Sequence, residues 1–95
     1  MYTILAEVRV EDLDRFLAVF TTEGLEKRTR HGSLGAEVLA AREDGDRLFV
    51  LIDWADRAAF EAFLADPEVP PTMARGGAKG RPSFTPVTRV KRLAA

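Results

Sequence analysis

Residues 48–54 constrain the fold more than any other part of the chain, because they are apolar on both sides of a predicted strand. Successive side chains of a strand point to opposite faces of its sheet. One face of this strand carries Leu48, Val50, Ile52 and Trp54, and the other carries Phe49 and Leu51. A chain of 95 residues forms about one hydrophobic core. We therefore expect helices of the same chain to cover one face and a partner to cover the other.

Three other segments have the pattern of strands. Apolar and polar residues alternate over residues 2–10, as they do in a half-buried strand. Residues 34–42 and 84–93 are also predicted strands. Pro86 predicts that the last strand lies at an edge of the sheet or is bulged there, because proline cannot donate a ladder hydrogen bond. Residues 43–46, Glu-Asp-Gly-Asp, are typical of a hairpin turn.

Two helices are predicted between the strands. The first follows Asp12 and ends at about Arg28, with a weak point at Gly24. Its apolar face consists of Leu13, Phe16, Leu17 and Phe20. The second helix has Asp56 as a suitable N-cap and ends at Asp66, which precedes a proline.

Residues 70–82 contain a Pro-Pro and a Gly-Gly pair, so we predict a loop with at most one helical turn, at residues 72–75. The glycine spacing differs from that of a phosphate-binding loop. One interpretation is a flexible basic flap over the mouth of a pocket, in which Arg75 and Lys79 contact an anionic ligand. The other interpretation is a connector without a ligand.

The order strand, helix, strand, strand, helix, strand is the ferredoxin-like arrangement. We therefore predict a single α+β domain over residues 1–95, with a four-stranded antiparallel sheet and two helices on one face. The helices are expected to cover the even-numbered side chains, which form the drier set: Ile4, Val8, Val10, Leu34, Val38, Val50, Ile52 and Trp54.

The odd-numbered side chains are too apolar to be left fully in water. This set mixes apolar and charged groups: Leu5, Leu39, Phe49, Leu51, Glu7, Arg9, Glu37 and Asp53. Burying a large apolar side chain contributes about 1.5–3 kcal/mol. We predict a symmetric homodimer in which two copies pack sheet against sheet. The alternative is a monomer with scattered exposed apolar groups.

The composition excludes several kinds of site. The chain has no cysteine, which excludes disulfides, thiolate nucleophiles, iron–sulfur clusters and thiolate zinc sites. Its single histidine, His31, cannot form a metal cluster, so no metal is expected. The net charge of -1, the lack of a long apolar run and the lack of a signal-peptide pattern predict a cytoplasmic protein that does not bind membranes. Basic residues predominate after Glu68, but the near-neutral chain does not fit nucleic-acid binding.

Residues 49–67, FVLIDWADRAAFEAFLADP, resemble the antibiotic biosynthesis monooxygenase family of the dimeric α/β-barrel superfamily. In that family a strand ends in Trp, a Ser or Asp caps the next helix, and an Ala-Phe pair lies inside it. With the matching order of elements, the resemblance covers residues 2–67. It implies a pocket between helices and sheet in each subunit of a dimer. It also implies, in active members, oxidation of aromatic polyketides by oxygen with no metal or flavin cofactor.

The chain departs from this family at two positions. Active members and haem-degrading relatives carry an asparagine on the first strand, which aligns best with Val8, and this chain contains no asparagine. Relatives that bind haem use a histidine in the second helix, where this chain has Phe63 or Leu64, and neither can ligate iron. Trp54 is the family's site residue that this chain retains.

The candidate site residues each have two interpretations. Trp54 could stack on a planar ligand and donate its N–H, or it could be a core aromatic. His31 could act as a general base, or it could be a structural or solvent-exposed residue. A further group could line an apolar pocket or pack in the core: Phe16, Phe20, Phe60 and Phe63, with Val8 beside them.

The leading functional hypothesis is a cofactor-independent monooxygenase that acts on a hydrophobic aromatic or polyketide-like molecule, with Trp54 positioning it and His31 or a water as base. The even face of the strands offers no carboxylate or histidine, because Glu7, Glu37 and Asp53 point to the other face. The alternatives are a dimeric small-molecule-binding or accessory protein without activity, and an isomerase or cyclase on the same scaffold.

Overall fold

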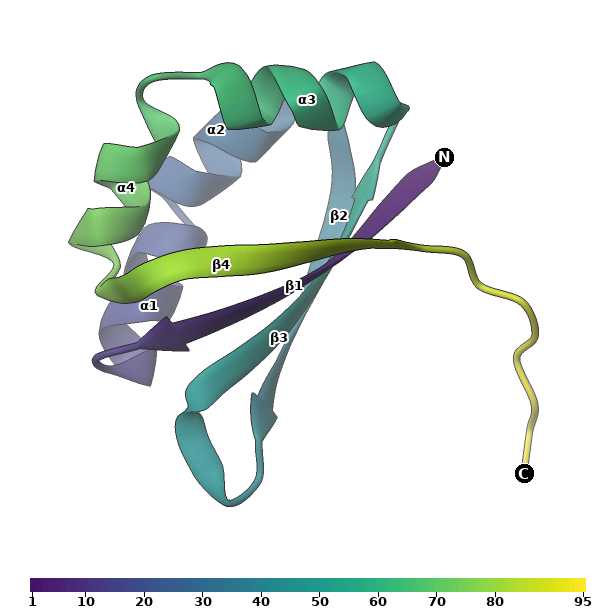
Figure 1. Ribbon diagram of the computed structural model, residues 1–95, viewed down its shortest axis with the longest axis horizontal. Helices are drawn as coiled ribbons and strands as arrows, with labels where there is room; N and C mark the ends of the chain where they lie inside the picture. The colour runs from purple at the N-terminus through teal and green to yellow at the C-terminus, as the bar shows by residue number, and fades with distance from the viewer.

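The computed structural model describes residues 1–95, which contain one four-stranded antiparallel sheet (Figure 1). The strands are β1 (Tyr2–Val10), β2 (Ser33–Ala41), β3 (Asp44–Trp54) and β4 (Ala78–Val87). Their order across the sheet is β2-β3-β1-β4, so β2 and β4 form the edges. Helical segments connect β1 to β2 and β3 to β4. This arrangement confirms the predicted ferredoxin-like α+β fold.

Four helices cover one face of the sheet (Figure 1). They are α1 (Leu13–Phe20), α2 (Glu23–Arg30), α3 (Arg57–Ala65) and α4 (Val69–Arg75). Two of them begin where the sequence predicts. The carboxylate of Asp12 accepts a hydrogen bond from the Arg15 amide at 3.1 Å, and that of Asp56 accepts one from the Ala59 amide at 2.8 Å. Both carboxylates therefore satisfy backbone donors that have no partner inside the helix.

The prediction of one continuous first helix is wrong, because the chain breaks between α1 and α2 at Thr21 and Thr22. The hydroxyl of Thr21 donates to the carbonyl oxygen of Leu17 at 2.7 Å, and that of Thr22 donates to the carbonyl oxygen of Ala18 at 2.7 Å. Such side-chain bonds to the preceding turn compete with the helical backbone ladder. The break gives α2 a direction of its own.

The predicted loop over residues 70–82 is also wrong, because this segment contains most of α4 and the start of β4. Pairing of β4 with β1 shifts between Glu7↔Ser83 and Arg9↔Lys79. Gly80, with φ +71°, lies within this irregularity. The glycine and proline residues that indicate a loop therefore form a bulged edge strand. β4 ends at Val87 rather than at residue 93, and its edge position agrees with the expectation from Pro86.

The core lies between the sheet and the helices, as predicted. Its buried members are Ile4, Ala6, Val8, Val10, Leu48, Val50, Ile52, Trp54 and Phe60. The even-numbered residues within 4–10 of β1 and 48–54 of β3 therefore face the helices. Leu34 was expected in this set but is 64% exposed. The register between β2 and β3 shifts between Ser33 and Gly35, so the even-odd pattern is interrupted at Leu34.

No helix covers the opposite face of the sheet, which we call the open face. Leu5, Phe49 and Leu51 are half-buried there, and Leu39 is 50% exposed. Residues 88–95 follow β4 without regular structure and extend away from the helices (Figure 1). Packing of a second copy on the open face stays a prediction.

Candidate functional site

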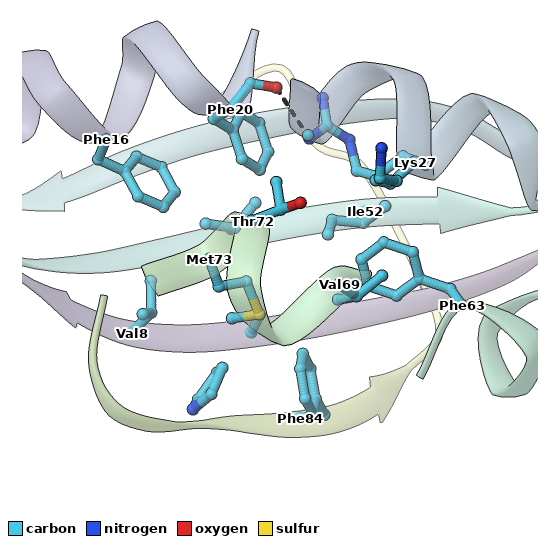
Figure 2. A pocket seen from close by; sticks show the side chains of 15 residues that line it. Val8, Phe16, Phe20, Lys27, Ile52, Phe63, Val69, Thr72, Met73 and Phe84 are labelled. Atoms are coloured by element: carbon cyan, nitrogen blue, oxygen red, sulfur yellow. Dashed lines mark hydrogen bonds between the residues drawn. The ribbon is translucent and has the colours of Figure 1, made fainter. Parts of the chain in front are cut away.

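A cavity of about 80 Å³ lies between the helices and the sheet (Figure 2). The strands contribute Ala6, Val8, Val50, Ile52, Pro82 and Phe84, and the helices contribute Phe16, Phe20, Gly24, Lys27, Arg28, Phe63, Val69, Thr72 and Met73. Four aromatic rings therefore line it, and those of Phe16 and Phe20 stack with centroids 5.1 Å apart. The site is built from all four helices and from three strands.

The cavity suits an apolar ligand better than water. A water needs roughly 10–15 Å³ of such volume, together with two to four polar partners. The hydroxyl of Thr72 is already used, because it donates to the Glu68 carbonyl at 2.8 Å and accepts from Arg75 Nη2 at 3.1 Å. The remaining wall is apolar apart from Lys27 and Arg28. Water molecules inside would therefore form few hydrogen bonds.

Two cations are the only charged side chains in the cavity wall. Arg28 is 6% exposed, and its guanidinium carbon lies 3.7 Å from the centre of the Phe20 ring. Its Nη1 donates to the Phe20 carbonyl oxygen at 3.0 Å. Burial lowers the pKa of Arg28 to about 10, so the group remains charged at neutral pH. The Nζ of Lys27 lies 3.4 Å from Oε1 of Glu26, a residue outside the wall.

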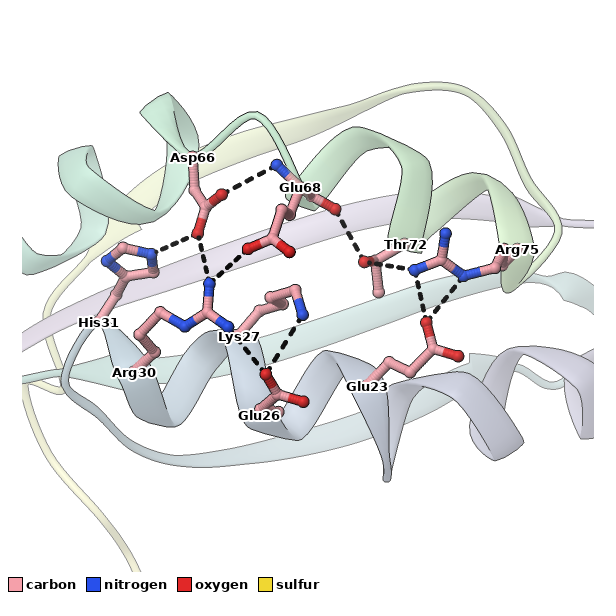
Figure 3. Close-up of polar contacts among 9 residues, drawn as sticks. All are labelled: Glu23, Glu26, Lys27, Arg30, His31, Asp66, Glu68, Thr72 and Arg75. Carbon is pink, nitrogen blue, oxygen red and sulfur yellow. Dashed lines mark hydrogen bonds and ion pairs between the residues drawn. The ribbon is translucent and has the colours of Figure 1, made fainter.

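Ion pairs hold α4, which forms one side of the cavity, against α2 (Figure 3). Nη1 of Arg30 lies 2.6 Å from Oε2 of Glu68 and 3.5 Å from Oδ2 of Asp66. At the other end of α4, Nε of Arg75 donates to Oε2 of Glu23 at 2.7 Å. The contacts with Glu68 and Glu23 are exposed, and such pairs contribute little stability individually. They fix the position of the helix that closes the cavity.

Trp54 lies in the core beside the cavity and does not line it. The residue is fully buried, and its Nε1 has no hydrogen-bond partner. Its ring packs against Phe63, with centroids 4.9 Å apart, and against Phe60, with centroids 5.7 Å apart. Phe63 also lines the cavity, so the Trp54 ring contacts a residue of the cavity wall.

His31 lies beside Phe63 and does not line the cavity either. Its Nε2 lies 2.7 Å from Oδ2 of Asp66, and its ring meets that of Phe63 edge-on at 6.3 Å. The hydrogen bond from His31 holds the pKa of Asp66 below its usual value. Asp66 also accepts a hydrogen bond from the Glu68 amide at 2.9 Å, so this carboxylate links His31 at the end of α2 to the turn between α3 and α4.

Only some of the predicted site residues come together. Four of them line one cavity: Val8, Phe16, Phe20 and Phe63. Phe60 packs in the core outside it. Arg75 belongs to α4 and pairs with Glu23, and Lys79 belongs to β4 and lies 3.6 Å from Asp46. The roles of these residues in ligand binding remain predictions.

Sequence reasoning missed the wall contributed by α2 and α4. Lys27 and Arg28 lie in a charged stretch, EGLEKRTR, where nothing distinguishes a buried cation from an exposed one. In α4 a signal was present, because Val69, Thr72 and Met73 have the three- and four-residue spacing of one helical face. The prolines at residues 70 and 71 concealed it, although proline is tolerated in the first turn of a helix.

Metal-ligand clusters and membrane-spanning helices were also considered. No group of three or more His, Cys, Asp or Glu side chains is placed to hold a metal ion. None of the helices has the length and apolar character needed to cross a membrane.

The fold and the cavity define a ferredoxin-like domain with an apolar cavity between its helices and its sheet. Residues 1–75 match the model of the antibiotic biosynthesis monooxygenase family, so the chain belongs to that family, as the resemblance over residues 49–67 implied. No curated protein matches the sequence.

Solved structures share the whole fold at low sequence identity. SnoaB, a cofactor-independent oxygenase from Streptomyces nogalater, has a TM-score of 0.75 and 19% identity, covering 99% of this chain and 97% of SnoaB. An antibiotic biosynthesis monooxygenase has a TM-score of 0.67 and 20% identity, with 96% and 100% covered. A conserved protein from Methanosarcina mazei Go1 has a TM-score of 0.68 and 15% identity, with 94% and 92% covered. At these identities the likeness demonstrates the fold alone.

Proposed function

We propose that this protein is a cofactor-independent monooxygenase whose substrate is a hydrophobic aromatic or polyketide-like molecule. The observation that carries the proposal is the apolar cavity, whose wall contains four aromatic rings and whose only charged groups are cations. Membership of the antibiotic biosynthesis monooxygenase family supports the reaction class. The description of SnoaB as a cofactor-independent oxygenase supports the lack of a cofactor.

In this reaction the substrate supplies its own electrons. A phenol or activated CH₂ group loses a proton to give a phenolate or enolate, and this anion transfers an electron to O₂. The resulting radicals combine into a carbon–oxygen bond, which gives a peroxide. Loss of water from the peroxide converts CH₂ into C=O, so one oxygen atom enters the product and the other leaves as water. A cationic apolar wall favours the anion, because Coulomb interactions strengthen when water is excluded.

The cavity wall does not supply a base for proton removal. No carboxylate or imidazole lines the cavity, and Val8 occupies the position that aligns best with the family's asparagine. We assign proton removal to a water, or to His31 after Phe63 turns aside. Trp54 would position the substrate through its unpaired indole N–H once the same ring has moved.

We further propose a homodimer that packs open face against open face. The half-buried Leu5, Phe49 and Leu51 and the exposed Leu39 give that face its apolar centre. Charged groups surround it, such as Arg89, whose Nη1 lies 2.9 Å from Oδ1 of Asp53. Burial of the apolar side chains in both subunits would offset the cost of association.

A second candidate is a dimeric binding or accessory protein that holds the same kind of ligand without oxidising it. The missing base favours this candidate. The lack of a base in the cavity wall also argues against the isomerase or cyclase hypothesis, since either reaction needs an acid or base at the substrate.

Oxygen uptake with a panel of anthrones and hydroquinones tests the proposed reaction. The informative variant is Ala6→Leu, which places three additional carbon atoms in the cavity wall. Ala36→Leu is its matched control, because Ala36 is exposed on the edge strand β2. We expect uptake above a protein-free control for wild type and Ala36→Leu, and its loss in Ala6→Leu. Equal oxygen uptake by Ala6→Leu and wild type would exclude the cavity as the substrate site. No uptake with any compound would favour the binding protein.

A further inference from the structure

A second cavity, of about 50 Å³, lies beside the first. Five of its seven lining residues also line the larger cavity, and the other two are Val19 and Gly76. All seven belong to α1, α2, α4 or the residue that caps α4, and none belongs to a strand. The second cavity therefore lies on the helix side of the larger one and shares a wall with it, where Phe16 and Phe20 lie opposite Met73 (Figure 2).

The second cavity has the size and the chemistry for a small apolar molecule. A water occupies roughly 10–15 Å³ of such volume and needs two to four polar partners. Among the side chains of this wall, Thr72 alone carries an oxygen or nitrogen atom. Its hydroxyl already donates to the Glu68 carbonyl at 2.8 Å and accepts from Arg75 Nη2 at 3.1 Å. Water would therefore form few hydrogen bonds there, whereas a diatomic gas is little larger than water and needs none.

Gly76 keeps the second cavity open. Its backbone has φ -77° and ψ 0°, a conformation that other residues also adopt, so the backbone does not require glycine at this position. A Cβ would lie 3.4 Å from the Met73 carbonyl oxygen and 3.5 Å from the Cβ of Val19, which are ordinary contact distances. An alanine methyl group therefore fits without displacing the backbone, and it takes up part of the space beside Val19.

We propose that the second cavity is the dioxygen site of this protein, while the larger cavity holds the organic substrate. The inference rests on the proposed function, which requires dioxygen, and it adds the place where the gas is held next to the substrate. Dioxygen is uncharged and apolar, so it partitions from water into an apolar cavity. A separate site is needed because a substrate that fills the larger cavity excludes the gas from it.

Paramagnetic relaxation by dissolved dioxygen tests the site without any oxidation. The relaxation rates of valine methyl groups are measured by NMR under equal pressures of dioxygen and nitrogen, and their difference, the dioxygen-induced relaxation, reports contact with the gas. Val19 lines only the smaller cavity, Val50 lines only the larger one, and Val90 is 93% exposed to solvent. We expect the dioxygen-induced relaxation of Val19 to be at least about twofold that of Val90, because the gas concentrates in the apolar site.

Gly76→Ala tests the cavity itself, and Gly35→Ala is its matched control, since no atom lies within 4 Å of a Cβ at residue 35. Gly76→Ala should lower the dioxygen-induced relaxation of Val19 to the level of Val90. With an anthrone that wild type oxidises, Gly76→Ala should raise the KM for dioxygen about threefold or more at unchanged kcat, the pattern of weakened binding. Gly35→Ala should match wild type in both measurements.

The proposal is overturned if wild-type Val19 shows no more dioxygen-induced relaxation than Val90, even where Val50 does, since the gas would then enter only the larger cavity. It is also overturned if a folded Gly76→Ala leaves either the Val19 relaxation or the KM for dioxygen unchanged. The wild-type comparison uses no variant, so poor folding of Gly76→Ala leaves the test intact.

The two proposals fail in different ways. Oxygen uptake with anthrones, together with no excess relaxation at Val19, would refute the dioxygen site and leave the proposed reaction standing. Excess relaxation at Val19 without oxygen uptake by any compound would uphold the gas site and favour the binding protein over the proposed reaction.

Discussion

Gly24→Ala is expected to destabilise the protein, although alanine is the better helix former. At an ordinary helix position this replacement stabilises by about 1 kcal/mol. At Gly24 the new Cβ would lie 3.1 Å from Nη1 of Arg28 and 3.2 Å from the carbonyl oxygen of Val19. The carbonyl belongs to the backbone of α1, so the guanidinium is the group that must move. Its displacement breaks the hydrogen bond to the Phe20 carbonyl.

The size of the expected destabilisation follows from the hydrogen bond between Arg28 and the Phe20 carbonyl. A hydrogen bond from a charged donor contributes about 1.5–3 kcal/mol. Subtraction of the helix gain of about 1 kcal/mol leaves a net loss of about 0.5–2 kcal/mol in the free energy of unfolding. Displacement of the cation from the Phe20 ring would increase the loss, because a stacked guanidinium contributes about 0.5–2 kcal/mol.

Urea unfolding followed by circular dichroism, at one protein concentration, measures this effect. The set consists of wild type, Gly24→Ala, Arg28→Met and the double variant, with Gly35→Ala as control because no atom lies within 4 Å of a Cβ there. We expect Gly24→Ala to lower the free energy of unfolding by less in the Arg28→Met background than in wild type. The difference between the two losses, which is the coupling energy of the two sites, should be about 1 kcal/mol. The reasoning is refuted if Gly24→Ala is as stable as wild type, or if its cost is the same in both backgrounds.

Three further predictions address the open face, the core aromatic and the acid stability. Leu51→Lys should convert the proposed dimer into a monomer in light-scattering chromatography, and an unchanged mass would mean that the open face is not the interface. Trp54→Ala should lose about 3–5 kcal/mol of stability, whereas Trp54→Phe should fold and show reduced oxygen uptake; uptake equal to wild type would remove Trp54 from the mechanism. The hydrogen bond from His31 lowers the pKa of Asp66, so its stabilisation is present above the unfolded-state pKa of about 3.9 and is lost as pH falls through the lower folded-state pKa. Asp66→Asn should therefore lose less stability than wild type in urea unfolding as the pH is lowered through that range, and equal acid sensitivity would contradict this.

The sheet and its faces could be predicted because strand periodicity is a local property. Apolar and polar side chains alternate over residues 2–10 except at Leu5, and β1 (Tyr2–Val10) has the same bounds in the structure. The even-numbered side chains of residues 4–10 and 48–54 are buried, as their apolar character indicated. The break at Thr21 and Thr22 could not be predicted, since threonine hydroxyls also occur inside helices without ending them.

Two parts of the site depended on the tertiary structure. The segment with Pro70 and Pro71 becomes a helix because its apolar face, with Val69 and Met73, closes over the cavity, and tertiary packing outweighs weak local propensity. Burial of Arg28 also results from tertiary packing, because the residue lies in a charged stretch whose sequence predicts an exposed side chain. Only the packing of α2 against α1 and α4 removes its guanidinium from water.

The sequence by itself determined the order of elements, the face of the sheet that the helices cover, and the family. The first two properties follow from residue spacing along a few turns or one strand, where the physical interactions are between near neighbours in the chain. The family follows from the resemblance of residues 49–67 and the match over residues 1–75. The tertiary structure decided which side chains line the cavity, that its only charges are two cations, and that the Trp54 N–H lies unpaired beside it. Burial and hydrogen-bond partners depend on residues far apart in the sequence, and no local pattern encodes them.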